Sequence, residues 1–139
     1  MPRSFNTSWR SELKFASAIL AGVAMLAATA ASAQDITGDA AAGEKVFKKC
    51  KACHDIEGKN KVGPHLDGVY GRVAGSVEDY KYSSGMKKLH DEGLVWNAET
   101  LAQYLPSPKD MVDKSKMTFS LKKEKDIENV IAYLASISE

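Results

Sequence analysis

The chain has 139 residues, of which 44% are hydrophobic and 27% are charged. With 19 Lys and Arg against 18 Asp and Glu, its formal net charge is +1, far from the strongly basic balance typical of proteins that bind nucleic acid. We therefore expect one small domain whose partners are not nucleic acids.

Residues 1–33 have the pattern of a cleavable secretory signal. The beginning is basic, with Arg3, Arg10 and Lys14, an alanine-rich apolar run follows, and Ala31-Ser32-Ala33 has the small residues of a cleavage site. A retained membrane anchor is the alternative, but the run is rich in alanine and serine and is marginal for a span of about 20 residues. We predict cleavage after Ala33, export to the periplasm and no stable membrane insertion afterwards.

The remaining residues, 34–139, are predicted to form one domain that begins with a helix. The leader contains three of the basic residues and one of the acidic residues, so the domain has a formal charge of about −1. Asp39 is a candidate N-cap, and apolar or small residues recur at helical spacing from there to Cys50. The pattern predicts a helix over residues 40–51.

The motif Cys50-Lys51-Ala52-Cys53-His54 has the C-x-x-C-H spacing of covalent c-type haem attachment. Two cysteines at this spacing can form thioethers with both vinyl groups on one porphyrin edge, and His54 would then be the proximal axial ligand. A redox dithiol is an alternative, but it expects a βαβ context, and a structural zinc site expects four ligands where the chain has no third cysteine. The motif therefore favours one haem c per chain, attached through Cys50 and Cys53.

The rest of the chain predicts short helices and long loops. Residues 55–75 are rich in glycine and have the composition of a loop. Helices are predicted over 80–89, over 97–105 with Asn97 as the cap, and over 121–137, where an apolar stripe faces a charged one. Residues 109–120 are predicted to be irregular. Because little β-branched alternation suggests a sheet, the expected fold class is all-α, with loops that pack on a haem.

A six-coordinate haem needs a second axial ligand. The candidates in residues 34–139 are His65, His90, Met86, Met111 and Met117. Met117 lies in an irregular stretch before the last helix, where a loop can bring its sulfur over a flat ring. The residues alone favour Met117, with Met111 next, and leave the choice open.

These motifs, in this order, resemble the class I cytochromes c, in particular the mitochondrial-like branch of bacterial periplasms. The resemblance covers residues 43–134 and rests on Gly43-Glu44-Lys45-Val46-Phe47, on Tyr133, on Val62-Gly63-Pro64 and on the loop Ser115-Lys116-Met117-Thr118-Phe119. It implies a fold in which the N-terminal and C-terminal helices cross and small helices and long loops surround one covalent haem.

The resemblance also implies roles for individual residues. The Pro64 carbonyl would accept a hydrogen bond from His54, and the Tyr104 hydroxyl would lie near the sulfur of Met117, the second axial ligand. Residues matching those around the haem propionates are Arg72, Tyr82 and Trp96.

The chain departs from the family pattern at three places. Lys114 stands where the family commonly has glycine, His65 stands where it commonly has asparagine, and the chain between Tyr82 and Trp96 is a few residues longer.

With His54 and Met117 on both sides of the iron, no position is open to substrate, so we expect an electron carrier and not an enzyme. The alternative is a small haem enzyme or ligand sensor whose sixth ligand is easily displaced. The expected partners of this monomer are periplasmic or membrane-bound redox proteins with acidic surfaces. Lysines near the haem edge that would meet them are Lys49, Lys109, Lys116, Lys122 and Lys123.

Overall fold

The computed structural model describes residues 36–139, and the predicted signal segment lies outside them. Helices in this part of the chain are α1 (Ala40–Phe47), α2 (Ser84–Asp91), α3 (Ala98–Tyr104), α4 (Pro108–Met111) and α5 (Glu124–Ser136). The extended pairing found here is one isolated bridge, between Val73 and Val95. None of the described helices has the length and apolar character needed to cross a membrane. The all-α prediction is confirmed.

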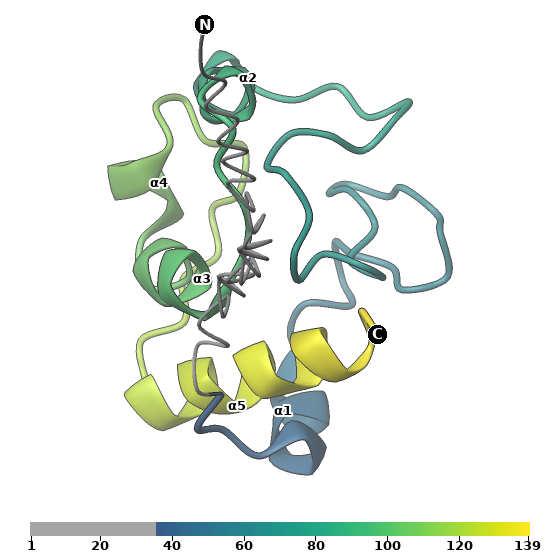
Figure 1. Ribbon diagram of the computed structural model, residues 1–139, viewed down its shortest axis with the longest axis vertical. Helices are drawn as coiled ribbons and strands as arrows, with labels where there is room; N and C mark the ends of the chain where they lie inside the picture. Colours follow the sequence, from purple (N-terminus) through teal and green to yellow (C-terminus); the bar gives the residue numbers. More distant parts are fainter. Residues whose placement is uncertain (1–35) are drawn as a thin grey trace, which may run out of the picture. The chain divides into compact units, whose positions relative to one another are not determined.

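Helices α1 and α5 cross each other, as Figure 1 shows at the lower edge of the view. A Cβ atom at Gly43 would lie 2.8 Å from the Cβ of Tyr133, so the crossing requires glycine at this position. Phe47 is fully buried, and its ring centroid lies 5.2 Å from that of Tyr133. The predicted contact between the two terminal helices is therefore confirmed.

Helix α1 ends earlier than its predicted end at residue 51. After Phe47 the chain continues in turns, because the Cys50 N–H donates to the Phe47 carbonyl at 2.8 Å, three residues back and not four. Because of these tighter turns, the cysteine motif does not continue helix α1.

The other helix ends follow from local capping. Helix α2 begins at Ser84 and not at residue 80, because the Ser83 Oγ caps it by accepting the Met86 N–H. The Asn97 cap of α3 is confirmed, with a full capping box to Thr100. Helix α5 starts only at Glu124, since the Leu121 N–H donates to the Leu105 carbonyl and keeps the preceding segment out of the helix.

Two further features set up the site. The first three residues of the stretch predicted to be irregular, 109–120, instead belong to the short α4, whose first residue, Pro108, suits a helix start. Between α1 and α2 the chain runs as long loops, on the right of Figure 1, opposite α3 and α4. The loops and the helices together enclose the cavity described next.

Candidate haem-binding site

A cavity of about 340 Å³ lies between the cysteine motif, the loop that follows it, α3 and residues 112–119, here called the Met117 loop. Its lining is mostly apolar, with Leu101, Leu105 and Val130 contributing to the walls. Every residue that the sequence singled out for haem binding lines this one cavity: Cys50, Cys53, His54, Pro64, Arg72, Tyr82, Trp96, Tyr104 and Met117.

The motif residues sit in consecutive tight turns. The Cys53 N–H donates to the Cys50 carbonyl at 3.1 Å, and the His54 N–H donates to the same carbonyl at 2.9 Å. Both thiols are free; Cys50 is partly buried and Cys53 is exposed. Burial raises the pKa of the Cys50 thiol to about 11, so it is protonated at neutral pH. The turns thus direct both sulfurs and the imidazole toward one cavity.

His54 is held on one ring nitrogen. Its Nδ1 lies 2.7 Å from the Pro64 carbonyl, which can only accept, so Nδ1 carries the proton and donates. Nε2 of the neutral ring is then left with a free lone pair. Burial is the largest cause that lowers the pKa of His54, with smaller lowering by Lys61 and Arg72, while the bond to Pro64 acts in the opposite direction. A neutral, oriented imidazole is the form that binds a metal.

Gly63 makes room for this histidine. A Cβ atom at residue 63 would lie 2.7 Å from Nδ1 of His54 and would collide with the ring. The Gly63 N–H also donates to the Cys53 carbonyl at 2.8 Å. The backbone of this loop therefore packs directly against the imidazole ring of His54.

On the opposite wall, the Met117 loop presents a partly buried sulfur. The Ser115 Oγ accepts the Met117 N–H at 3.2 Å and lies 3.3 Å from the Met117 carbonyl, to which it donates. Lys114 has φ 54°, the left-handed backbone that glycine adopts more readily. The loop thus places a lysine in a backbone conformation that favours glycine.

Tyr104 and Trp96 close the cavity above α3. Both are buried, and their ring centroids are 4.9 Å apart. Burial raises the pKa of Tyr104, partly offset by its hydroxyl contact with Ser115 in the Met117 loop. The indole N–H of Trp96 donates to no group among residues 36–139. A buried donor without a partner, on a residue that lines a cavity, is suited to an acceptor on a bound group.

Arg72 and Tyr82 lie along another part of the wall. The Arg72 guanidinium donates to the His65 and Asp67 carbonyls, at 2.9 and 3.2 Å, which fixes its place at the cavity. Burial lowers the pKa of Arg72 and raises that of Tyr82. The Tyr82 hydroxyl accepts the Val77 N–H at 3.2 Å and keeps its own proton free to donate. Positive charge and a free O–H are the partners that carboxylates such as haem propionates need.

The other candidate ligands divide clearly. Met86, from α2, lines the cavity as Met117 does, whereas His65, His90 and Met111 do not. The Nδ1 of His65 lies 2.8 Å from Asp67 Oδ1, and that of His90 lies 3.0 Å from the Ala74 carbonyl. Through residues 36–139 no three or more His, Cys, Asp or Glu side chains gather in a way that could hold a metal ion, so the zinc alternative finds no support.

The five lysines predicted at the haem edge are not equivalent. Lys49 and Lys116 line the cavity, while Lys109, Lys122 and Lys123 do not. Lys49 forms an ion pair with Asp126 at 3.6 Å. The Lys122 ammonium donates to the Pro106 carbonyl.

Sequence reasoning missed Tyr80, which lines this cavity. It named Val62 and Phe119 within motifs but gave them no role, and both line the cavity, with 74% and 39% of their surface exposed. The signal for Tyr80 was present in the pair Tyr80-Lys81-Tyr82, whose two rings, on the same side of an extended segment, stack edge to face at 4.7 Å.

The donor set and the shape fit a covalently attached haem. Two free thiols, a neutral imidazole, a thioether sulfur and a set of carboxylate-binding groups all line one largely apolar cavity. No competing cluster of ligands occupies it. The residues present therefore match the group that the sequence motif predicts.

Comparisons with known proteins agree with this reading. The family model described as cytochrome c matches residues 40–138. A cytochrome c2 of Rhodospirillum rubrum is 46% identical over 129 residues, which cover 86% of this chain and 96% of that protein.

Solved structures give the same result. Cytochrome cH from Methylobacterium extorquens is 46% identical, with a TM-score of 0.66 over 71% of this chain and 99% of its own. Cytochrome c2 from Rhodospirillum centenum is 38% identical, with a TM-score of 0.70 over 73% of this chain and 100% of its own.

Proposed function

This chain belongs to the cytochrome c family and carries electrons with a haem c bound at Cys50 and Cys53, and we propose that His54 and Met117 are the two axial ligands of the iron. One observation carries the proposal: His54 and Met117, more than sixty positions apart in the sequence, line the same cavity as both cysteines. When bound, the haem supplies a one-electron ferric–ferrous couple.

On the proximal side, His54 offers Nε2 because its Nδ1 proton is engaged by the Pro64 carbonyl. That hydrogen bond orients the ring and raises its basicity as a ligand. Gly63 prevents the ring from swinging away, since its backbone contacts the imidazole directly.

On the distal side, Met117 offers a soft sulfur that favours the reduced iron. The apolar walls exclude water and disfavour the extra charge of the oxidised state, which also raises the reduction potential. If His54 and Met117 both bound the iron, no position would be left for a substrate, in agreement with the family's role as a carrier and not an enzyme.

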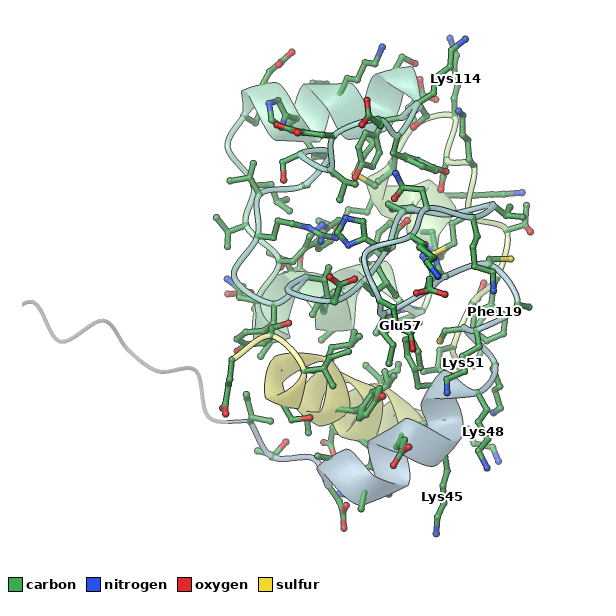
Figure 2. All side chains as sticks on the ribbon, turned by 90° about the vertical axis from the view of Figure 1, so that its right-hand side faces the viewer. Lys45, Lys48, Lys51, Glu57, Lys114 and Phe119 are labelled. Atoms are coloured by element: carbon green, nitrogen blue, oxygen red, sulfur yellow. The ribbon has the colours of Figure 1, made fainter. Side chains whose placement is uncertain are left out.

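The partners are redox proteins, and we propose that they dock where exposed lysines surround the cavity mouth. In Figure 2, Lys114 is seen at the upper right, Lys51 and Lys48 lie below Phe119, and Lys45 is at the bottom; Phe119 lines the cavity. Lys49 and Lys116 lie at the lining itself. A positive rim around an apolar contact suits an acidic partner and speeds its association at low salt. We place this exchange in the periplasm, on the strength of the predicted leader.

The docking proposal is tested by electron-transfer rates to an acidic redox partner at increasing ionic strength. We expect Lys51→Glu to slow the bimolecular rate at low salt, with the difference from wild type vanishing at high salt. The matched control is Lys125→Glu, which makes the same charge change in the first turn of α5, outside the cluster of lysines that includes Lys51. Equal effects of the two variants would show that only net charge matters.

The ligand proposal is tested by the absorption spectrum of the ferric protein. Wild type should show the weak sulfur-to-iron charge-transfer band at the near-infrared edge and should not bind carbon monoxide at neutral pH when reduced. Met117→Ala should lose the band and bind carbon monoxide readily, whereas Met111→Ala, outside the cavity, should keep the wild-type behaviour. A wild type that already binds carbon monoxide would favour a haem enzyme or sensor.

A further inference from the structure

We propose that the segment 80–86 is the positioning element of the Met117 loop and sets how readily the sulfur of Met117 leaves the iron. The inference rests on the proposed ligation by Met117. It assigns a role to a segment that is named neither by the haem motif nor by the ligand pair. Three contacts carry it.

The first contact is backbone against backbone. A Cβ atom at Gly85, in the first turn of α2, would lie 2.7 Å from the Asp113 amide nitrogen and closer still to the Asp113 carbonyl oxygen. Backbone atoms cannot rotate away as a side chain can, so the approach requires glycine. The next residue of the loop is Lys114, with φ 54°, and it lies beside α2 in Figure 2. A shift of Asp113 would therefore also move Lys114, whose left-handed turn comes just before Met117.

The second contact holds the other side of that turn. The Lys116 ammonium donates to the Lys81 carbonyl and lies 6.0 Å from the centre of the Tyr80 ring. Lys116 immediately precedes Met117 in the chain. The loop is thus held at Asp113 and at Lys116 by one short segment.

The third contact fixes the segment itself. The Tyr80 hydroxyl donates to the Val62 carbonyl at 2.8 Å, two residues before Pro64, which binds His54. The segment is therefore anchored to the loop that orients the proximal ligand. The same segment therefore contacts the loop of each proposed axial ligand, so a change in the segment alters the position of Met117.

The loop has little internal support of its own. The hydrogen bonds within the loop are those from the Ser115 N–H to the Val112 carbonyl, at 3.1 Å, and those between Ser115 and Met117. Contacts from outside must hold the sulfur in place. Tyr104 supplies one at Ser115, and the segment 80–86 supplies the others, at Asp113 and at Lys116.

The test compares two Gly→Ala variants of the haem-loaded protein. Gly85→Ala introduces the Cβ that collides with Asp113. Gly93→Ala, just after α2, adds a Cβ at φ +72° with no atom within 4 Å. The readouts are the affinity of the ferric iron for imidazole, which competes with Met117, and the intensity of the sulfur-to-iron band.

We expect Gly85→Ala to bind imidazole about tenfold more tightly than wild type and to lose part of the band. Gly93→Ala should lower the denaturation midpoint and leave the imidazole affinity unchanged. If Gly85→Ala binds imidazole no more tightly than Gly93→Ala, the positioning proposal is overturned.

A third variant separates this proposal from the one on which it rests. If wild type binds imidazole as tightly as Met117→Ala, then Met117 is not the ligand and the proposed function fails first. Should Gly85→Ala fail to fold, Lys116→Gln removes the ammonium that reaches Lys81 and should raise the imidazole affinity about threefold. An unchanged affinity in that variant would also overturn the proposal.

Discussion

The two walls of the haem cavity are held by different kinds of contact. His54 is fixed by its own neighbourhood: Pro64 is ten residues away, and Gly63 packs on the ring. Met117 depends on distant segments, since Lys81 lies 35 positions from Lys116. The proximal wall is thus locally determined, whereas the distal wall exists only when the whole domain is folded.

This difference predicts which wall yields first. Local turns persist while tertiary contacts fluctuate, and regions with few buried contacts of their own open at low free-energy cost. The proximal wall is also bound covalently through Cys50 and Cys53. We therefore expect Met117, and not His54, to be the ligand that exchanges when the domain loosens.

The largest expected effect comes from damaging the proximal wall. Gly63→Ala places a Cβ 2.7 Å from Nδ1 of His54 and should break its hydrogen bond to Pro64. We expect the free energy of unfolding of the haem-loaded protein to fall by about 3 kcal/mol, from overpacking together with a lost buried hydrogen bond. Denaturant titration measures it.

The matched control is Gly68→Ala, which lies in the same long loop between α1 and α2 as Gly63. It has φ +72° and no atom within 4 Å of the added Cβ, so it should cost only about 1 kcal/mol. If both variants lose the same free energy, the imidazole contact contributes nothing and the contrast between the walls is weakened.

An intermediate effect is expected at the link between the two walls. Tyr80→Phe removes the hydroxyl that donates to the Val62 carbonyl and should destabilise the protein by about 1 kcal/mol. Thermal unfolding would measure the change. Tyr70→Phe is the control, because the Tyr70 hydroxyl bonds to nothing within residues 36–139. If both variants lose the same free energy of unfolding, the hydrogen bond from Tyr80 to Val62 does not stabilise the protein.

The smallest effect has the opposite sign. Lys114→Gly relieves a left-handed backbone at φ 54° and should raise the free energy of unfolding by about 0.5 kcal/mol. The same change at Lys87, inside α2, should lower it by about 1 kcal/mol. If Lys114→Gly also destabilises, the turn of the Met117 loop is not strained.

The parts of the fold that the sequence predicted are those with local or periodic signals. The C-x-x-C-H motif, the Asn97 cap and the apolar stripe of α5 each depend on residues within one segment. The crossing of α1 and α5 was predicted from the family resemblance, which implied that Gly43 and Tyr133 meet where the two helices cross.

What the sequence could not predict depends on partners that are remote along the chain. The start of α5 is delayed because Leu121 bonds to Leu105, and Tyr80 reaches the cavity because Val62 accepts its proton. Gly85 looks like an ordinary, unfavourable residue in a helix until Asp113 is placed beside it. Contacts between residues so far apart produce no repeating pattern that could be recognised in a single sequence.

The junction at Asn129 has a consequence for the order in which the chain takes shape. Its buried amide oxygen accepts the Asp39 N–H across 90 positions of sequence. Closing a loop of that length costs about 4 kcal/mol of chain entropy before any contact is made. The first helix of the domain therefore docks only when the last one is present, and a chain truncated before α5 would leave α1 without its partner and the ring of Phe47 without its contact with Tyr133.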